Sequence, residues 1–190
     1  MLKLYGADVF FHGIVRDNRE EIRRALHDAI EKRPDLIIST GGVSLGKFDL
    51  VKSVLEECGA GIHFHKVAVR PGKPVLFGAF VSGGPVFFGL PGNPIAVAVA
   101  TRFFVRPYLG ALYGENREVP HLLPLTQELS KPEGLSFFHR AIRDGQGVRV
   151  LPGQASFMAA SFLKAEGWVV GAPEAALLRR GDLVEWYALW

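Results

Sequence analysis

The chain has 190 residues, of which 48% are hydrophobic and 22% are charged, and its formal net charge is +3. This composition excludes a disordered chain, and an excess of 22 basic over 19 acidic residues is too small to indicate a nucleic-acid partner. The single cysteine, Cys58, excludes an internal disulfide, which fits a reducing cytoplasm. No apolar run has the length of a membrane span, so we expect a soluble, cytoplasmic protein with no membrane partner.

A strand and a helix begin the predicted order of elements. Residues 7–15 are predicted to form a buried strand, and Asp17 or Asn18 then supplies the N-cap of a helix. The apolar residues of this helix repeat on one face of a 3.6-residue period until Pro34 ends it. The next strand spans residues 35–40 and is apolar on both faces, as is typical of a buried parallel strand.

Strands and helices continue to alternate up to the middle of the chain. A second helix is predicted over residues 50–55 and a strand from Ile62, and two short strands at 75–80 and 85–90 precede a helix over 95–103. This order predicts an α/β domain with a mostly parallel sheet in three layers. In such a domain, ligands bind outside the carboxyl ends of the strands.

The composition changes after Gly114, where a polar linker at residues 115–120 ends the helical periodicity. We therefore predict a domain boundary near Arg117, with an α/β domain at 1–117 and a second domain at 118–190. Short strand-like segments separated by turns predict that the second domain is a small β-barrel. These segments are 122–129, 135–142, 147–151, 168–171 and 182–189.

A glycine-rich segment at residues 41–49 joins a predicted strand to a predicted helix. Its glycines allow backbone N–H groups to approach a ligand closely, which suits an anion or a metal-bound phosphate. An ordinary strand-to-helix turn is the alternative interpretation. The candidate ligand-contacting residues of the segment are Gly41, Gly42, Ser44, Gly46 and Asp49.

A second candidate anion site is the turn Pro91-Gly92-Asn93-Pro94. Asn93 is a good N-cap and Pro94 suits the first helical turn, so the turn presents a helix N-terminus to whatever lies in front of it.

A basic segment lies between these two turns. Lys66 and Arg70 are expected at positions i and i+4 of one strand, so both side chains point to the same face, and Lys73 follows after a turn. Three converging cations would hold an oxyanion, while Pro71 and Pro74 stiffen the backbone that aims them. A solvated strand face is the alternative for Lys66 and Arg70.

Three motifs together resemble the molybdopterin molybdenumtransferases, the MoeA and gephyrin E-domain family. They are Gly-Gly-Val-Ser-x-Gly-x-x-Asp at 41–49, Arg-Pro-Gly-Lys-Pro at 70–74 and Gly-Leu-Pro-Gly-Asn-Pro at 89–94. A β-rich tail ending in Gly-Asp-Leu-Val-Glu at 181–185 follows them. The resemblance implies a MoaB/MogA-like α/β domain followed by a β-barrel domain.

The resemblance also implies an activity. Such enzymes are magnesium-dependent homodimers that insert molybdate into adenylylated molybdopterin and release AMP. Asp49, a hard oxygen donor, would bind Mg²⁺, and Asp49 and Lys73 would be the catalytic residues. A functional link to a molybdopterin adenylyltransferase is implied as well. The residues expected to bind the pterin substrate are Gly41, Gly42, Ser44, Gly46, Lys66, Arg70, Pro71, Gly72, Pro91, Gly92, Asn93, Pro94, Arg140 and Ser156.

The chain departs from the resembling family at its start. Members begin the α/β domain with a strand ending in Thr-Gly-Asp-Glu, whose acids contribute to the metal site, and this motif is not in the sequence. We therefore expect a C-terminal portion with little activity alone. The alternatives are a molybdopterin adenylyltransferase of the MogA type, which lacks the β-rich tail, and a dimeric, non-catalytic scaffold like the gephyrin E domain.

Overall fold

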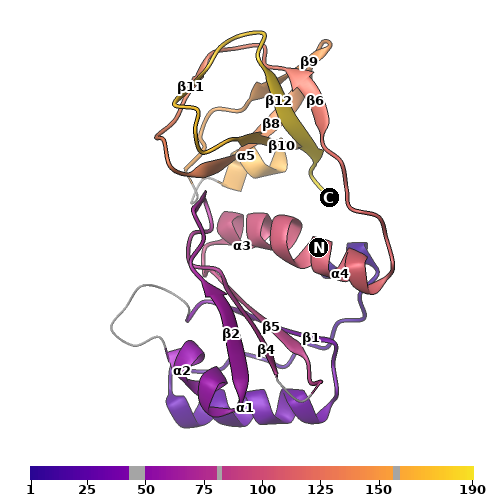
Figure 1. The fold of residues 1–190 in the computed structure, drawn as a ribbon, viewed down its shortest axis with the longest axis vertical. Helices are drawn as coiled ribbons and strands as arrows, with labels where there is room; N and C mark the ends of the chain where they lie inside the picture. The colour runs from indigo at the N-terminus through magenta and orange to yellow at the C-terminus, as the bar shows by residue number, and fades with distance from the viewer. Residues whose placement is uncertain (43–49, 81–82, 156–158) are drawn as a thin grey trace.

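The computed structural model describes residues 1–42, 50–80, 83–155 and 159–190. Figure 1 shows a lower sheet with two helices beneath it, an upper sheet, and a helix lying between the two sheets. In the first half of the chain the elements are η1 (Leu2–Tyr5), α1 (Arg19–Glu31), β1 (Leu36–Thr40), α2 (Leu50–Glu57), β2 (Ala60–His65), β3 (Val69–Arg70), β4 (Leu76–Phe80), β5 (Val86–Leu90), α3 (Pro94–Ala100), the π-helical turn η2 (Thr101–Val105) and α4 (Arg106–Leu112).

The first sheet has the strand order β1-β5-β4-β2. Only β1 and β5 are parallel, whereas β4 pairs antiparallel with both β5 and β2. The prediction of a mostly parallel sheet is therefore wrong, and the described strands form a mixed sheet. The reason is the short connection between β4 and β5, because a parallel pair needs a crossover of about a dozen residues or more.

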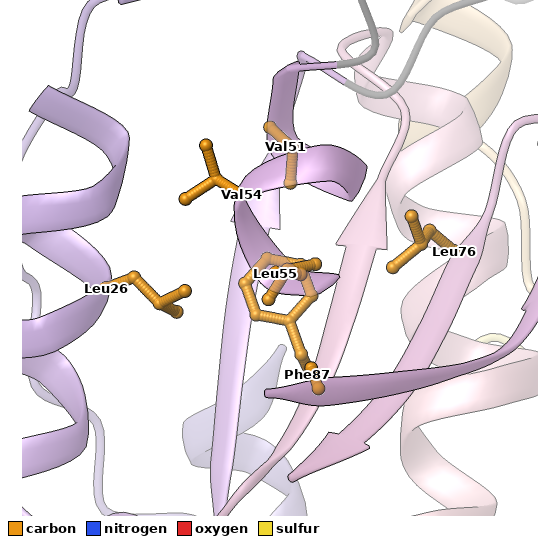
Figure 2. Packing of buried hydrophobic residues seen from close by; sticks show 7 residues of the cluster. Leu26, Val51, Val54, Leu55, Leu76 and Phe87 are labelled. Atoms are coloured by element: carbon orange, nitrogen blue, oxygen red, sulfur yellow. The ribbon is translucent and has the colours of Figure 1, made fainter. Parts of the chain in front are cut away.

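Helices cover both faces of the first sheet, as the alternation of elements predicted. On one face, Leu26 of α1 and Val54 and Leu55 of α2 pack against Phe87 of β5 (Figure 2). The neighbouring residue, Phe88, points to the opposite face and packs in a cluster with residues of η2 and α4. Successive residues of a strand point to opposite faces, so β5 contributes to the core on both sides.

The predicted helix starts are confirmed where the structure describes them. The Asn18 side chain accepts hydrogen bonds from the backbone N–H groups of Glu20 at 2.9 Å and Glu21 at 3.2 Å. Asn93 caps α3 in the same way, accepting from the backbone N–H of Ile95 at 3.1 Å, with Pro94 as the first helical residue. Both asparagines satisfy donors that an uncapped helix leaves free.

The predicted buried strand at residues 7–15 is wrong. The segment lies outside every strand, and its apolar side chains include Phe10, which is 68% exposed, and Ile14, which is 96% exposed. Among the described residues, β1 pairs with β5 alone and no strand pairs with the segment. An apolar strand pattern becomes a buried strand only where a neighbouring strand supplies backbone partners.

The second sheet contains β3 and five strands of the second half: β6 (His121–Pro124), β8 (Ser136–Asp144), β9 (Gly147–Val150), β10 (Gly167–Gly171) and β12 (Leu183–Ala188). Its order is β3-β8-β10-β12-β6, with β9 paired to β8. Its first strand, β3, comes from the first half of the chain, and Val69 and Arg70 pair in parallel with Ser136 and Phe137. A bridge between Leu125 and Val148 brings the chain after β6 against β9. The other elements of this half are β7 (Leu129–Ser130), α5 (Ala159–Leu163) and β11 (Leu177–Leu178).

The two halves share an apolar core. Ile95 and Val99 of α3 pack in one cluster with Phe138 of β8 and Trp168 of β10. The helix from Pro94 to Leu112, with a mean hydropathy of 1.4, is long and apolar enough to span a membrane by length and composition, but 56% of it is buried inside the protein. Core helices of soluble proteins have the same character, and the contacts with both sheets account for its apolar residues.

Candidate functional site

The first and third motifs meet at the carboxyl ends of β1 and β5. The backbone N–H of Gly41 donates to the carbonyl of Leu90 at 3.0 Å, and a Cβ atom on Gly92 would lie 3.6 Å from the Cα of Gly41. Gly41 and Gly42 have φ angles of 82° and 69°, a region that L side chains rarely adopt. The two glycines therefore permit the turn that places the start of the loop beside the start of α3.

The second motif packs against the same helix. A Cβ atom on Gly72 would lie 3.7 Å from the carbonyl oxygen of Ala96 in α3. The backbone N–H of Val67 donates to the carbonyl of Lys73 at 2.9 Å and closes a turn over residues 66–73, here called the basic turn. The Arg70–Pro71 peptide in this turn is cis. All three motifs therefore adjoin the first turns of α3, although they lie up to fifty residues apart in the sequence.

The three cations do not lie on one strand. β2 ends at His65, Lys66 has a φ of 75°, and Arg70 belongs to β3 in the other sheet. The prediction that Lys66 and Arg70 share one strand is therefore wrong, since a left-handed residue interrupts the pleat between them. Lys66, Arg70 and Lys73 are all exposed, and none forms an ion pair with a carboxylate in the described parts of the chain.

Four predicted site residues lie outside the described residues: Ser44, Gly46, Asp49 and Ser156. Within the described ranges no group of three potential metal ligands occurs. The expected magnesium contact of Asp49 thus stays a prediction from the motif.

Arg140 supports a loop of the second half. Its side chain is 1% exposed, and its guanidinium donates to the carbonyls of Gly153 at 2.9 Å and Ala155 at 3.2 Å. The side chain of Gln154 completes this contact by accepting from the Arg140 backbone N–H at 3.0 Å. Arg140 therefore shapes the chain immediately before Ser156, and its contact with an anion stays a prediction.

Asp17 adjoins the glycine-rich loop, although the sequence indicates it only as a possible helix cap. Its Oδ1 atom lies 3.7 Å from the position of a Cβ on Gly42, so an exposed carboxylate adjoins the glycine-rich loop. Carboxylate oxygens are the ligands that Mg²⁺ prefers in proteins. Asp17 lies directly before the N-cap Asn18, so the start of α1 adjoins the carboxyl end of β1. An acid at that position is the sequence signal that could have revealed Asp17.

His139 is a buried titratable group on the sheet that carries Arg140. Burial, together with the nearby cations Lys131 and Arg140, lowers the pKa of His139 from 6.5 to about 4. Lys131 is itself buried, and its ammonium donates to the carbonyl of Leu135 at 3.2 Å. Because burial and the two nearby cations both lower its pKa, the imidazole of His139 is neutral at physiological pH.

Acidification from about pH 7 to about pH 4 is expected to destabilise the protein partly through His139. Below about pH 6.5 the unfolded chain binds a proton that folded His139 does not, so the free energy of unfolding falls, by at most about 3 kcal/mol. Urea unfolding of the parent and of His139→Phe at both pH values measures the effect, and His139→Phe should show a shallower decline. His27→Phe, at an exposed position, is the control, and equal pH slopes in all three proteins would contradict this role.

The geometry defines a class of protein: an α/β domain in which a glycine loop and a helix N-terminus meet at the carboxyl ends of parallel strands and form a candidate anion site. The chain belongs to a particular family within that class, described as the probable molybdopterin binding domain, whose sequence profile matches residues 1–111.

Curated relatives agree with this family. The chain is 35% identical over 185 residues to a molybdopterin molybdenumtransferase from Synechococcus elongatus, a match that covers 97% of this chain and 46% of the relative. The corresponding enzyme of Haemophilus influenzae is 32% identical, with the same coverage. A gephyrin from Dictyostelium discoideum is 37% identical over 116 residues, or 54% of this chain and 16% of the relative.

One solved structure of a similar protein covers the whole length of this chain. The molybdopterin biosynthesis MoeA protein from Pyrococcus horikoshii superimposes with a TM-score of 0.79 at 26% identity, over 100% of this chain and 46% of that protein. The chain thus spans about half the length of the relatives it matches.

Proposed function

We propose that this chain forms part of the site at which a molybdopterin molybdenumtransferase inserts molybdate into adenylylated molybdopterin and releases AMP. The observation that supports the proposal is the meeting of the three motifs around the start of α3. The relatives named as this enzyme match both halves of the chain, which favours the transferase over an adenylyltransferase that lacks the β-rich tail.

The roles of the residues follow from their chemistry. The N–H group of Gly42 and the start of α3 would bind phosphate oxygens, whereas the N–H of Gly41 is engaged with the carbonyl of Leu90. Lys66, Arg70 and Lys73 would hold molybdate. Mg²⁺ would neutralise phosphate charge during the transfer, with Asp49 and Asp17 as the carboxylates near the loop. Exposed cations without carboxylate partners in the described chain are free to bind an anion.

Architecture and assembly form a further part of the proposal. We infer a domain boundary near Arg117 and closure of the second sheet into a small barrel, which the bridge between Leu125 and Val148 supports. We also propose a cytoplasmic homodimer that receives its substrate from a molybdopterin adenylyltransferase. Sedimentation velocity of the protein tests the dimer.

The decisive assay is AMP release from adenylylated molybdopterin. We expect release to require both Mg²⁺ and molybdate, and to be weak in this chain alone and stronger in a longer polypeptide that contains it. Omission of each ion is the control, and release of AMP without molybdate would contradict the proposal. An unchanged rate in Asp49→Ala would contradict the metal role of that carboxylate.

A further inference from the structure

Arg102 is a buried charge that the proposed chemistry does not use. It lies in η2, within the same continuous helix whose first turn forms part of the site, and its side chain is 3% exposed. A buried guanidinium needs partners for its donors, because leaving them unpaired away from water costs free energy. The identity of those partners indicates what Arg102 does.

The hydrogen-bond partners of the Arg102 side chain all come after the helix in the sequence. Nη1 and Nη2 donate to the two carboxylate oxygens of Glu118 at 2.7 and 2.6 Å, and Nε donates to the carbonyl of Ala188 at 3.2 Å. The guanidinium also lies 5.7 Å from the ring centre of Tyr187. Glu118 precedes β6 and Ala188 ends β12, so one side chain ties the helix to two segments of the second half.

In the described part of the chain, hydrogen bonds thus attach the second half to the first half in two places. One attachment is the pairing of Val69 and Arg70 in β3 with β8, next to the basic turn. The other is Arg102 with Glu118 and Ala188, where the chain end returns to the helix (Figure 1). The apolar core between them resists separation but is non-directional, whereas a bidentate pair fixes an orientation.

We propose that Arg102 is a positioning residue that fixes the orientation of the second half relative to the helix from Pro94 to Leu112. With β3 holding one end, loss of the Arg102 contacts lets the second half turn about that strand. The loop held by Arg140 then changes its distance from the basic turn. The orientation itself is independent of the proposed function, and only its consequence for molybdate binding rests on that function.

A distance measurement in solution tests the orientation. Spin labels on Cys58, the single cysteine, and on Arg180→Cys would report one label in each half by pulsed electron resonance. Arg102→Met should broaden the distance distribution. Arg102→Lys should restore part of the narrow distribution, because an ammonium can bind the Glu118 carboxylate but cannot form the bidentate pair. Arg106 lies on the same helix and forms a more exposed ion pair with Glu115, so Arg106→Met should leave the distance distribution unchanged.

Glu118→Gln keeps the test valid if Arg102→Met does not fold. Glu118 is 46% exposed, so the substitution should be tolerated, yet it removes the carboxylate that both guanidinium nitrogens contact. Distributions as narrow as that of the parent in every folded variant would overturn the proposal, even if their melting temperatures fell. That outcome would leave Arg102 a contributor to stability alone.

Molybdate titration by calorimetry measures the consequence for the site. Arg102→Met should weaken molybdate binding by about tenfold, with Arg106→Met as the control. Unchanged affinity with a broadened distribution would overturn the link to the site while leaving the orientation role in place. If the parent binds no molybdate, the proposed function fails and the distance result still decides the orientation role.

Discussion

Replacing both Arg70 and Lys73 by alanine is expected to weaken molybdate binding by about a hundredfold or more. Each exposed cation would form charge-assisted hydrogen bonds with the oxyanion, and such bonds are worth about 1.5 to 3 kcal/mol each. Neither side chain pairs with a carboxylate in the described chain, so their removal should change the free energy of unfolding by only about 0.5 kcal/mol. Calorimetric titration with molybdate and urea unfolding measure the two effects.

A variant that loses the same charge elsewhere shows whether the loss of molybdate affinity reflects a binding site or the lower net charge of the protein. Arg179→Ala with Arg180→Ala removes two exposed cations from the turn before β12, and it should leave molybdate affinity within about twofold of the parent. An equal loss of affinity in both double variants would mean that the anion responds to net charge. The loss in the Arg70 and Lys73 variant should also persist when phosphate replaces molybdate, because both anions offer oxygen acceptors.

Local chemistry accounts for most of what the sequence predicted correctly. The helix starts at Asn18 and Asn93 depend on a side chain and the N–H groups two or three residues later, so a short window of sequence contains the whole interaction. The placement of the glycine-rich segment at the carboxyl end of a strand followed from one topological rule, that ligands of such domains bind outside the carboxyl ends of the strands. Its contact with Gly92 depends on the parallel pairing of β1 with β5, which no local pattern specifies.

The wrong predictions depended on pairing between distant segments. A two-residue strand such as β3 has no periodicity, and its partner β8 lies more than sixty residues away, so nothing local separates Lys66 from Arg70. Residues 7–15 have the pattern of a buried strand, but burial requires a neighbouring edge. Asp17 was recognised only as a cap for the same reason, since its neighbour Gly42 comes from another element.

Trp168→Ala is expected to lower the free energy of unfolding by about 3 to 5 kcal/mol. Trp168 is completely buried, and its ring lies 5.9 Å from Phe162 and 6.2 Å from Phe103. Trp168→Phe should cost far less, because it keeps an aromatic ring and removes a buried indole N–H that has no hydrogen-bond partner among the described residues. Trp190→Ala, at a half-exposed position, is the surface control.

The same variant tests whether the two halves unfold together. Trp168 lies in the second sheet but packs in one cluster with Ile95 and Val99 of α3, and Val97 and Ala100 of the same helix pack in a cluster of the first half. Loss of the indole should therefore lower the urea midpoint reported by a fluorophore on Cys58 as much as the midpoint reported by far-ultraviolet circular dichroism. An unchanged midpoint at Cys58 would mean that the halves unfold independently. A coincident shift would mean that the helix carrying the site is stabilised by the second sheet, so the anion site depends on a core that neither half completes alone.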